Sequence, residues 1–284
     1  MNTTPKTILV VMAHPDDESF GMGGTLAYYS SLGVDVHLVC ATRGEAGTVD
    51  PEYLQKYKTI AELREAELHC AGQALGLKSI SFLDYRDSGM VGSQDNQNPA
   101  SLVQAPLEQV AERIVGHIRR LKPQVVITFD ETGGYYHPDH IAVHKATVAA
   151  FHAAGDAAQF PKAGAPFQPD KLFFNARNRA RLRRAVLFMR LLRKDPSKVG
   201  RNKDIDLTRL ARDVDTPKHV SINYRSVQAR KDQADACHAS QGGGRFIGSN
   251  LLEVVARWLG NQDHFTQGYP LVAEDYRSTD FFAS

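Results

Sequence analysis

Hydrophobic residues along the first two thirds of the chain follow two alternating patterns. Short apolar runs, most of them rich in β-branched residues, predict strands buried in a sheet; the runs are Lys6–Ala13, Val36–Ala41, Ser79–Leu83, Val125–Phe129 and Lys171–Asn175. Between them, apolar residues at helical spacing predict helices; these cover Thr25–Leu32, Thr59–Leu75, Pro106–Leu121 and Ile141–Ala153. The alternation predicts an α/β fold, with a Rossmann-like, mostly parallel sheet and helices on both faces. Lys171–Asn175 is expected to be the last strand of the main sheet.

The rest of the chain predicts a smaller C-terminal region over the edge of the sheet that carries the active site. We expect one domain over residues 1–284, with an α/β core at 6–175, a basic segment at 176–205 and a completing region at 206–284. In that last region, apolar spacing predicts helices over Val227–Ser240 and Leu251–Leu259 that pack back on the sheet.

The basic segment contains eleven Lys and Arg residues and one acidic residue between Arg177 and Lys203, and it predicts an amphipathic helix over Arg181–Lys194. Such a helix could lie on an anionic membrane, contact nucleic acid or dock on another subunit. A solvated helix with one face on its own domain is the favoured interpretation. A lid that selects anionic or bulky substrates is a further hypothesis, on which neutralising the arginines at 181, 183 and 184 would raise KM.

Composition limits the class of protein. The 284 residues carry a net charge of +2, with 42% hydrophobic and 23% charged residues, as in ordinary globular proteins. The longest apolar run, Ile8–Ala13, has six residues, whereas a membrane-spanning helix needs about 20. Cys40, Cys70 and Cys237 are too few and too scattered for a disulfide framework. We therefore expect a reduced, cytoplasmic protein with no membrane span, and the near-neutral charge argues against a dedicated nucleic-acid binder.

Polar clusters follow four of the predicted strands; they are His14–Glu18, Thr42–Glu45, Asp84–Ser88 and Asp130–His140. In a parallel sheet, ligands bind beyond the carboxyl ends of the strands, and those ends share one edge. The four clusters are therefore expected to meet there.

The first cluster leads into a glycine-rich stretch, Gly21–Thr25, which alone would suggest a phosphate-binding turn. Three consecutive acids, Asp16 to Glu18, would oppose a phosphate at that turn. These acids could instead cap the following helix, because carboxylates favour a helix N-terminus. A helix cap does not need a neighbouring histidine, however, and His14 beside the acids favours a divalent cation.

His14 and Asp17 lie three positions apart across a turn that a proline stiffens, and His140 comes from the last cluster. Two histidines and one carboxylate with open positions suit Zn²⁺ or Fe²⁺ with an exchangeable water. Asp16 could then act as the base that the water needs. His144 leaves an alternative open, because with His140 it forms an i, i+4 pair that could also bind a metal.

Two motifs carry a resemblance to a known family: AHPDDE at Ala13–Glu18 and HPDH at His137–His140. Together they resemble the LmbE/PIG-L family of metal-dependent N-acetylglucosaminyl deacetylases. Further similar motifs are TRGEAG at Thr42–Gly47, LREAEL at Leu63–Leu68, YRDSGM at Tyr85–Met90 and HASQ at His238–Gln241. YRDSGM is similar to the mycothiol-pathway branch, which contains deacetylases and S-conjugate amidases.

The resemblance implies a role for each matching residue. It implies His14, Asp17 and His140 as metal ligands and Asp16 as general base. It also implies His137 as the cation that stabilises the oxyanion.

The resemblance further places Tyr135 as a mobile tyrosine near the oxyanion, and it places Arg64, Asp87 and Glu45 where the family contacts the sugar. For two of these residues simpler roles stay open. Arg64 could form a surface ion pair with neighbouring glutamates, and Asp87 could cap its loop.

These patterns predict a metal-dependent hydrolase, with Zn²⁺ or alternatively Fe²⁺, that removes an acetyl group from a small molecule containing N-acetylglucosamine. An amidase acting on thiol-sugar S-conjugates is the alternative enzyme. Outside enzymes, a nucleotide- or nucleic-acid-binding module could use the glycine-rich turn and the basic helix. The expected partner is an amino-sugar conjugate, and homo-oligomerisation stays open.

Overall fold

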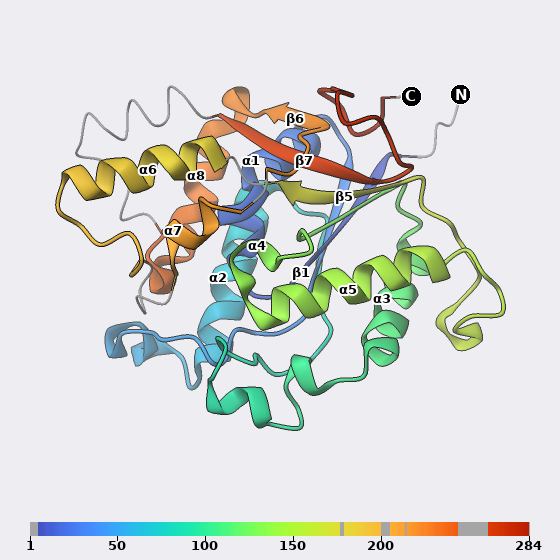
Figure 1. Ribbon diagram of the computed structural model, residues 1–284. Helices are drawn as coiled ribbons and strands as arrows, with labels where there is room; N and C mark the ends of the chain where they lie inside the picture. The colour runs from blue at the N-terminus through green and yellow to red at the C-terminus, as the bar shows by residue number, and fades with distance from the viewer. Residues whose placement is uncertain (1–4, 177–178, 200–204, 214, 244–260, 284) are drawn as a thin grey trace.

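One sheet runs through the computed structural model, which describes residues 5–176, 179–199, 205–213, 215–243 and 261–283 (Figure 1). Its strand order in these residues is β3-β2-β1-β4-β5-β7-β6. The strands are β1 (Thr7–Met12), β2 (Asp35–Cys40), β3 (Ser79–Phe82), β4 (Val125–Thr128), β5 (Lys171–Ala176), β6 (Val220–Asn223) and β7 (Gln262–Tyr269). The first five pair in parallel, and β7 is antiparallel to both β5 and β6. The predicted α/β class with a mostly parallel sheet is therefore confirmed.

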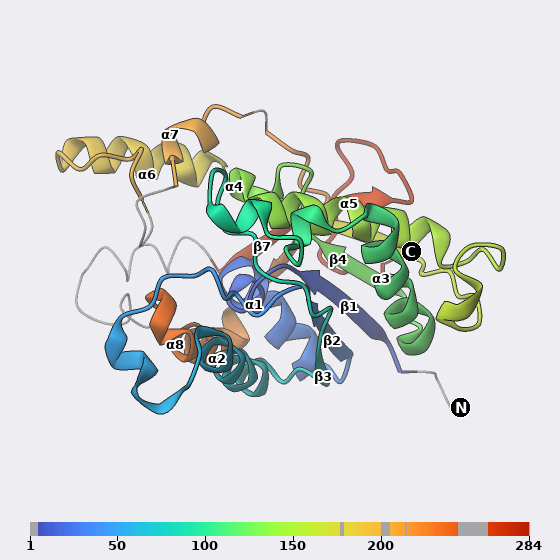
Figure 2. The ribbon, with the colours of Figure 1, turned by 90° about the horizontal axis from the view of Figure 1, so that it is seen from below.

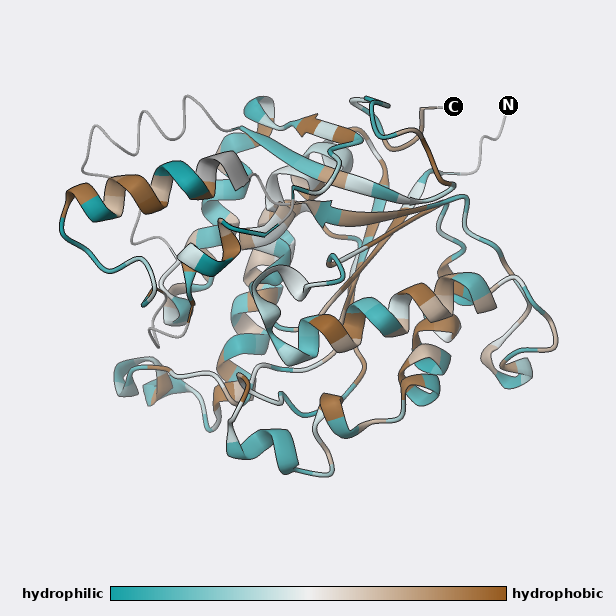
Figure 3. Cartoon of the chain, viewed as in Figure 1, coloured by the Kyte–Doolittle hydropathy of each residue, from teal (hydrophilic) through white to brown (hydrophobic). Residues whose placement is uncertain are grey.

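Helices cover both faces of the sheet, as Figure 2 shows. One face carries α1 (Asp17–Ser31), α2 (Ile60–Leu75) and α8 (Gln228–Cys237), and the other carries α3 (Leu107–Leu121) and α5 (Pro138–Ala153). Every residue of β1 is buried, as expected for a strand covered on both faces, and the central strands are hydrophobic in Figure 3. The remaining helices in the described residues are α4 (Gly133–Tyr136), α6 (Arg179–Leu191) and α7 (Leu207–Leu210). The 3₁₀ turns are η1 (Pro51–Lys56), η2 (Gln94–Gln97), η3 (Leu102–Gln104), η4 (Pro161–Ala163), η5 (Arg225–Val227) and η6 (Ala239–Gln241).

Helix α2 shows how local sequence sets the bounds of an element. Thr59 precedes the helix, and its side chain accepts a hydrogen bond from the Glu62 backbone N–H, which is the usual N-cap interaction. Gly76 ends the helix in the left-handed region, with φ 74°, where glycine carries no steric penalty. These bounds agree with the predicted helix to within one residue.

Helix α1 begins at Asp17, but its backbone is non-helical at Met22, with φ −153° and ψ 20°. The regular helix after this kink therefore starts close to the predicted Thr25. The prediction missed the helical turn before the kink because it took the glycines as a turn. At Gly24 a Cβ atom would lie 2.2 Å from the Tyr224 ring, so this glycine allows close packing within the helix. Asp17 and Glu18 occupy the first turn, where carboxylates are favourable.

The prediction that β5 is the last strand of the main sheet was also wrong, because β7 pairs with β5 and β6 pairs with β7. β7 has the sequence QDHFTQGY and β6 has only four residues. Neither therefore has the apolar run typical of a buried strand. Both lie at one side of the sheet, where fewer apolar residues are needed.

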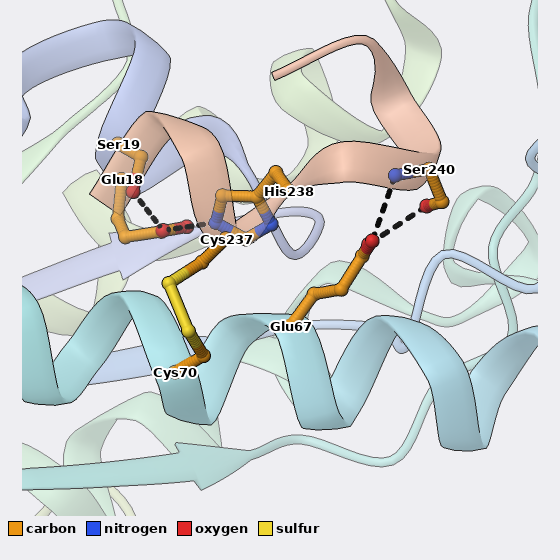
Figure 4. The surroundings of a disulfide bond; sticks show 7 residues. All are labelled: Glu18, Ser19, Glu67, Cys70, Cys237, His238 and Ser240. Carbon is orange, nitrogen blue, oxygen red and sulfur yellow. Dashed lines mark hydrogen bonds and ion pairs between the residues drawn. A yellow bond between two sulfur atoms is a disulfide. The ribbon is translucent and has the colours of Figure 1, made fainter. Parts of the chain in front are cut away.

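Cys70 of α2 and Cys237 of α8 form a disulfide bond (Figure 4). The expectation that all three cysteines are reduced was therefore wrong for these two. They are 167 residues apart, and only the packing of α8 on α2 brings them together. Cys40 is free and buried.

Of the remaining predictions, the basic helix is confirmed as α6, and the helix over Val227–Ser240 is seen as η5, α8 and η6. The predicted helix at Leu251–Leu259 lies outside the described residues. Among the helices in the described ranges, none is long and apolar enough to cross a membrane.

Candidate active site

The polar clusters meet at the carboxyl edge of the parallel strands, around a cavity of about 360 Å³. Eight of the nine predicted site residues line it; they are His14, Asp16, Asp17, Arg64, Asp87, Tyr135, His137 and His140. The remaining lining residues include Asp130, Asn175, Ile205 and Gln241. All four clusters contribute to the cavity walls or to the contacts behind them, as predicted from their places at the carboxyl ends of the strands.

His14, Asp17 and His140 bring three hydrogen-bond-accepting groups to one point. His14 Nδ1 lies 3.2 Å from His140 Nε2. The Asp17 carboxylate spans both rings, with Oδ1 3.3 Å from His140 Nε2 and Oδ2 3.6 Å from His14 Nδ1. All three side chains are at least nine-tenths buried. Acceptors that face one another so closely away from water need a proton or a cation between them.

The other nitrogen of each ring explains why these atoms are acceptors. His140 Nδ1 lies 3.0 Å from the carbonyl oxygen of Gly133 and donates to it, which leaves the Nε2 lone pair toward the cavity. His14 Nε2 lies 3.2 Å from Asp139 Oδ2 and 3.4 Å from Asp87 Oδ1, so it donates to a carboxylate. Metal-binding histidines are oriented by such partners.

The spacing of these groups suits a tetrahedral ion. Two ligand atoms at the usual Zn–N or Zn–O distance of such an ion lie about 3.3 Å apart; the two histidine nitrogens lie 3.2 Å apart, and each is 3.3 to 3.6 Å from one oxygen of Asp17. Two further groups have ligand atoms within 4.8 Å of one another: His14, His137 and His140, and His14, Asp87 and Asp139. Asp17 differs from His137 in that its negative charge would compensate part of the charge of a divalent cation.

Burial lowers the pKa of His14, but Asp87, Asp139 and Asp17 together outweigh it and hold that pKa well above its usual value. Burial likewise disfavours the ionised form of Asp17, yet His140 and His14 lower its pKa overall. The carboxylates thus favour positive charge on His14, and the two imidazoles favour negative charge on Asp17.

Asp16 precedes Asp17 in the chain and has an unusual backbone conformation, with φ 121°. Arg64 Nη2 donates to Asp16 Oδ2 at 2.8 Å. The backbone N–H of Asp16 donates to Glu18 Oε2 at 3.0 Å. Burial raises the pKa of Asp16 to about 6, although Arg64 opposes the rise. A carboxyl group with a pKa in this range suits proton transfer near neutral pH.

The surroundings of His137 disfavour the protonated imidazole that the resemblance implies. Burial and the nearby rings of His14 and His140 lower its pKa to about 2, so the neutral imidazole is favoured. The Asp139 backbone N–H donates to His137 Nδ1 at 3.2 Å, which places the ring proton on Nε2. A neutral His137 can therefore still donate a hydrogen bond.

Tyr135 lies in α4, a single turn with distorted backbone: Gly134 has φ 73°, and Tyr136 has φ 66°. The Tyr135 ring lies 4.9 Å from the His140 ring and 5.8 Å from the His137 ring. The structure thus places Tyr135 at the cavity, beside the two histidines, as predicted.

The three predicted sugar-contacting residues differ in position. Arg64 is 4% exposed, and its guanidinium donates to Asp16 and to the backbone carbonyls of Gly44 and Pro15. It is therefore not a surface ion pair. Asp87 lines the cavity and contacts His14. Glu45 accepts a hydrogen bond from the Asp87 backbone N–H and is not among the residues that line the cavity.

One alternative from the sequence is not seen. His144 Nδ1 lies 2.9 Å from the Phe129 carbonyl oxygen, and His144 does not line the cavity, so it forms no metal-binding pair with His140. For the lid hypothesis, Ile205 lines the cavity, whereas the exposed Arg183 and Arg184 are not among its lining residues. Arg183 instead lies 3.4 Å from Asp215 and donates to the Ala211 carbonyl.

Several residues to which sequence analysis assigned no role lie at the site in the structure. Asp139, which is fully buried, supports His14 and accepts from the Ser88 backbone N–H at 2.9 Å. His238 lies 2.7 Å from Glu18, and Gln241 lines the cavity. All are in motifs that the resemblance included, but their contacts depend on distant segments.

Comparisons with known proteins agree with this site. A family model described as PIG-L, GlcNAc-PI de-N-acetylase, matches residues 9–151. A 1D-myo-inositol 2-acetamido-2-deoxy-alpha-D-glucopyranoside deacetylase from Rhodococcus erythropolis is 34% identical over 99% of this chain and 98% of its own length. A relative with the same name from Rhodococcus jostii is 36% identical over 83% of this chain and 82% of its own length.

Solved structures show the same fold. The N,N'-diacetylchitobiose deacetylase from Pyrococcus horikoshii is similar with a TM-score of 0.61 at 18% identity, over 92% of this chain and 83% of that one. The 4-carboxy-2-hydroxymuconate hydratase from Pseudomonas putida is similar with a TM-score of 0.58 at 18% identity, over 94% of this chain and 98% of that one. Because a hydratase shares the fold, the fold alone does not identify the reaction. The match to the family model and the full-length relatives do decide the family: this chain belongs to the PIG-L family, as its HPDDE and HPDH motifs indicated.

Proposed function

We propose that this protein is a metal-dependent hydrolase that removes the acetyl group from a small molecule containing N-acetylglucosamine. The observation that carries the proposal is the convergence of His14 Nδ1, His140 Nε2 and the Asp17 carboxylate at the cavity. Membership of the PIG-L family and the names of the two Rhodococcus relatives support the same reaction.

In this proposal His14, Asp17 and His140 hold the ion, which is Zn²⁺ or alternatively Fe²⁺. A bound ion of this kind supplies Lewis-acid polarisation of the amide carbonyl and lowers the pKa of water. A set of two imidazole nitrogens and one carboxylate fits both metals. The proposal therefore leaves the choice to measurement.

Asp16 acts as the general base in this proposal. Its carboxylate accepts a proton from the attacking water and passes it to the departing amine nitrogen. His137 donates its Nε2–H to the carbonyl oxygen as negative charge develops there, and Tyr135 lies beside the same position. Acetate leaves, and a free amine remains on the sugar.

For the substrate we propose an N-acetylglucosamine–inositol conjugate, because both Rhodococcus relatives are named for an acetamido sugar on inositol. Asp87 and Arg64 both line the cavity and are the proposed sugar contacts. The same names favour the deacetylase over an amidase that acts on thiol-sugar S-conjugates. One domain, a cytoplasmic location, homo-oligomerisation and the lack of a nucleic-acid partner stay predictions.

The proposal is tested by metal content and amine release. Wild type, His140→Ala and His144→Ala are given the same zinc reconstitution, and bound metal is measured by elemental mass spectrometry. We expect about one ion per chain in the wild type and in His144→Ala, and little in His140→Ala, because a missing ligand leaves an incomplete site. His144 is the matched control, one turn along α5 from His140.

The same three proteins are then given an N-acetylglucosamine–inositol conjugate, and released amine is measured. We expect release by the wild type and by His144→Ala, and loss of at least about 1000-fold in His140→Ala. A wild type that binds no ion, or that binds one and releases no amine from any N-acetylglucosamine conjugate, would contradict the proposal.

A further inference from the structure

A segment near the C-terminus reaches the base of the active site. His238 and Glu18 are both fully buried, and His238 Nε2 lies 2.7 Å from Glu18 Oε1 (Figure 4). The two residues are 220 positions apart. Glu18 also accepts a hydrogen bond from the Ser19 hydroxyl on the same oxygen, at 2.6 Å.

The second carboxylate oxygen of Glu18 holds Asp16. The Asp16 backbone N–H donates to Glu18 Oε2 at 3.0 Å. With φ 121°, Asp16 is in a region that residues with a side chain rarely adopt. Such a conformation persists only where the surrounding structure imposes it, and Glu18 is the acceptor that the backbone of Asp16 meets here.

The side chain of Asp16 is held separately. Arg64 Nη2, from α2, donates to Asp16 Oδ2 at 2.8 Å. The backbone is thus held by Glu18 and the carboxylate by Arg64. Loss of either contact would leave Asp16 free to turn relative to the neighbouring ligand Asp17.

His238 is the group that keeps the Glu18 carboxylate in place. A buried carboxylate needs strong hydrogen bonds or a cation, and His238 supplies a donor that carries positive charge when protonated. His238 Nδ1 has no hydrogen-bond partner among the described residues, so the contact to Glu18 is the one polar contact of this ring in that part of the chain.

The position of His238 is itself fixed on both sides. The preceding residue, Cys237, is bonded to Cys70 of α2. Two residues later, Ser240 donates through its backbone N–H and its hydroxyl to Glu67 of α2, at 2.8 and 2.7 Å. Figure 4 shows these contacts along one face of α2. The segment is therefore fastened to the helix that also carries Arg64.

We propose that His238 is a positioning residue for the proposed general base: by holding Glu18, it fixes the backbone of Asp16 beside the metal ligands. This inference rests on the proposed function. The inference assigns a role in the reaction to His238, which is not among the residues that line the cavity.

The test compares two substitutions at one position. His238→Gln keeps an N–H donor near the position of Nε2, whereas His238→Leu fills similar space without a donor. We expect His238→Leu to lower kcat about 10- to 100-fold, as for other residues that orient an active-site group, with KM and zinc content near those of the wild type. His238→Gln should recover most of the wild-type kcat.

Tyr29→Phe is the control for stability. Tyr29 lies on the same helix, α1, and its hydroxyl bonds to Asp280 and to the Phe281 backbone N–H. This variant loses buried hydrogen bonds away from the cavity, so its thermal midpoint should fall while its kcat stays unchanged.

Equal kcat in His238→Leu and wild type would overturn the inference, and so would equal losses in the Leu and Gln variants. A His238→Leu protein that loses its zinc would also overturn it, because the role would then be in the metal site. A wild type that releases no amine is a different result, since it contradicts the proposed function itself.

Discussion

The segment that matches the family model, residues 9–151, and the C-terminal region, residues 206–283, contribute to the site in different ways. The first supplies the proposed ligands and the base from positions next to strand ends, such as His14 after β1. The second supplies Gln241 to the cavity and His238 behind it. The reactive groups therefore come from local motifs, whereas part of their support comes from residues distant in the sequence.

The difference is also seen in what each region does for the sheet. β1 to β4 are parallel and place their carboxyl ends at one edge, which is where ligands bind in such sheets. β7 pairs antiparallel with β5, and β6 pairs antiparallel with β7; both contact α1 and bring the C-terminal region alongside it. A site built in one region can thus depend on packing from the other.

The largest expected effect concerns the two adjacent carboxylates of the first region. Asp16→Asn should lower kcat about 100- to 10,000-fold, since it removes the proposed general base, and should keep about one zinc per chain. Asp17→Asn should lose most of the zinc, because it weakens a proposed ligand. Activity assays and elemental mass spectrometry on the two variants measure both effects.

Asp17→Asn is thus the matched control, with the same chemical change one residue away. If Asp16→Asn loses zinc while Asp17→Asn keeps it, the assignment of ligand and base is reversed. If both variants keep zinc and full activity, neither carboxylate has the proposed role.

The sequence predicted the parts of the molecule that depend on neighbouring residues. β1 and α2 were predicted nearly to the residue, because a buried apolar run and a capped helix are local patterns. The convergence of His14 and His140 followed from their places after predicted parallel strands, whose carboxyl ends share one edge. Spacing along the chain therefore predicted the position of side chains that come soon after buried strands, such as His14 after β1.

Long-range contacts explain what the sequence did not predict. Gly24 of α1 packs against Tyr224, 200 residues away in the chain, a contact that the glycine-rich sequence alone does not reveal. The low pKa of His137 depends on burial and on the rings of His14 and His140, which spacing along the chain does not reveal. The Cys70–Cys237 bond likewise depends on how α8 packs on α2.

Removing that disulfide should weaken the attachment of α8 to α2 without changing a residue that lines the cavity. Cys70→Ser/Cys237→Ser should lower the free energy of unfolding by about 2–4 kcal/mol, because a cross-link between distant residues restricts the unfolded chain. Urea unfolding of the oxidised wild type and the double variant measures the difference. Addition of a thiol reductant should reduce the difference in the free energy of unfolding between the two proteins. Cys40→Ser, which leaves the bond intact, is the control substitution.

The smallest expected effect lies where α7 of the C-terminal region meets the loop that carries Tyr135. The Arg209 guanidinium lies 3.9 Å from the centre of the Tyr136 ring, next to Tyr135 in α4. A cation–π contact at an exposed site contributes about 0.5–1 kcal/mol, so Arg209→Gln should lower kcat/KM about two- to fivefold without loss of zinc. Steady-state kinetics against Arg212→Gln, an exposed arginine nearby, measures the effect. Equal kcat/KM in the two variants would mean that the C-terminal region supports the site through His238 and Gln241 but not through α7.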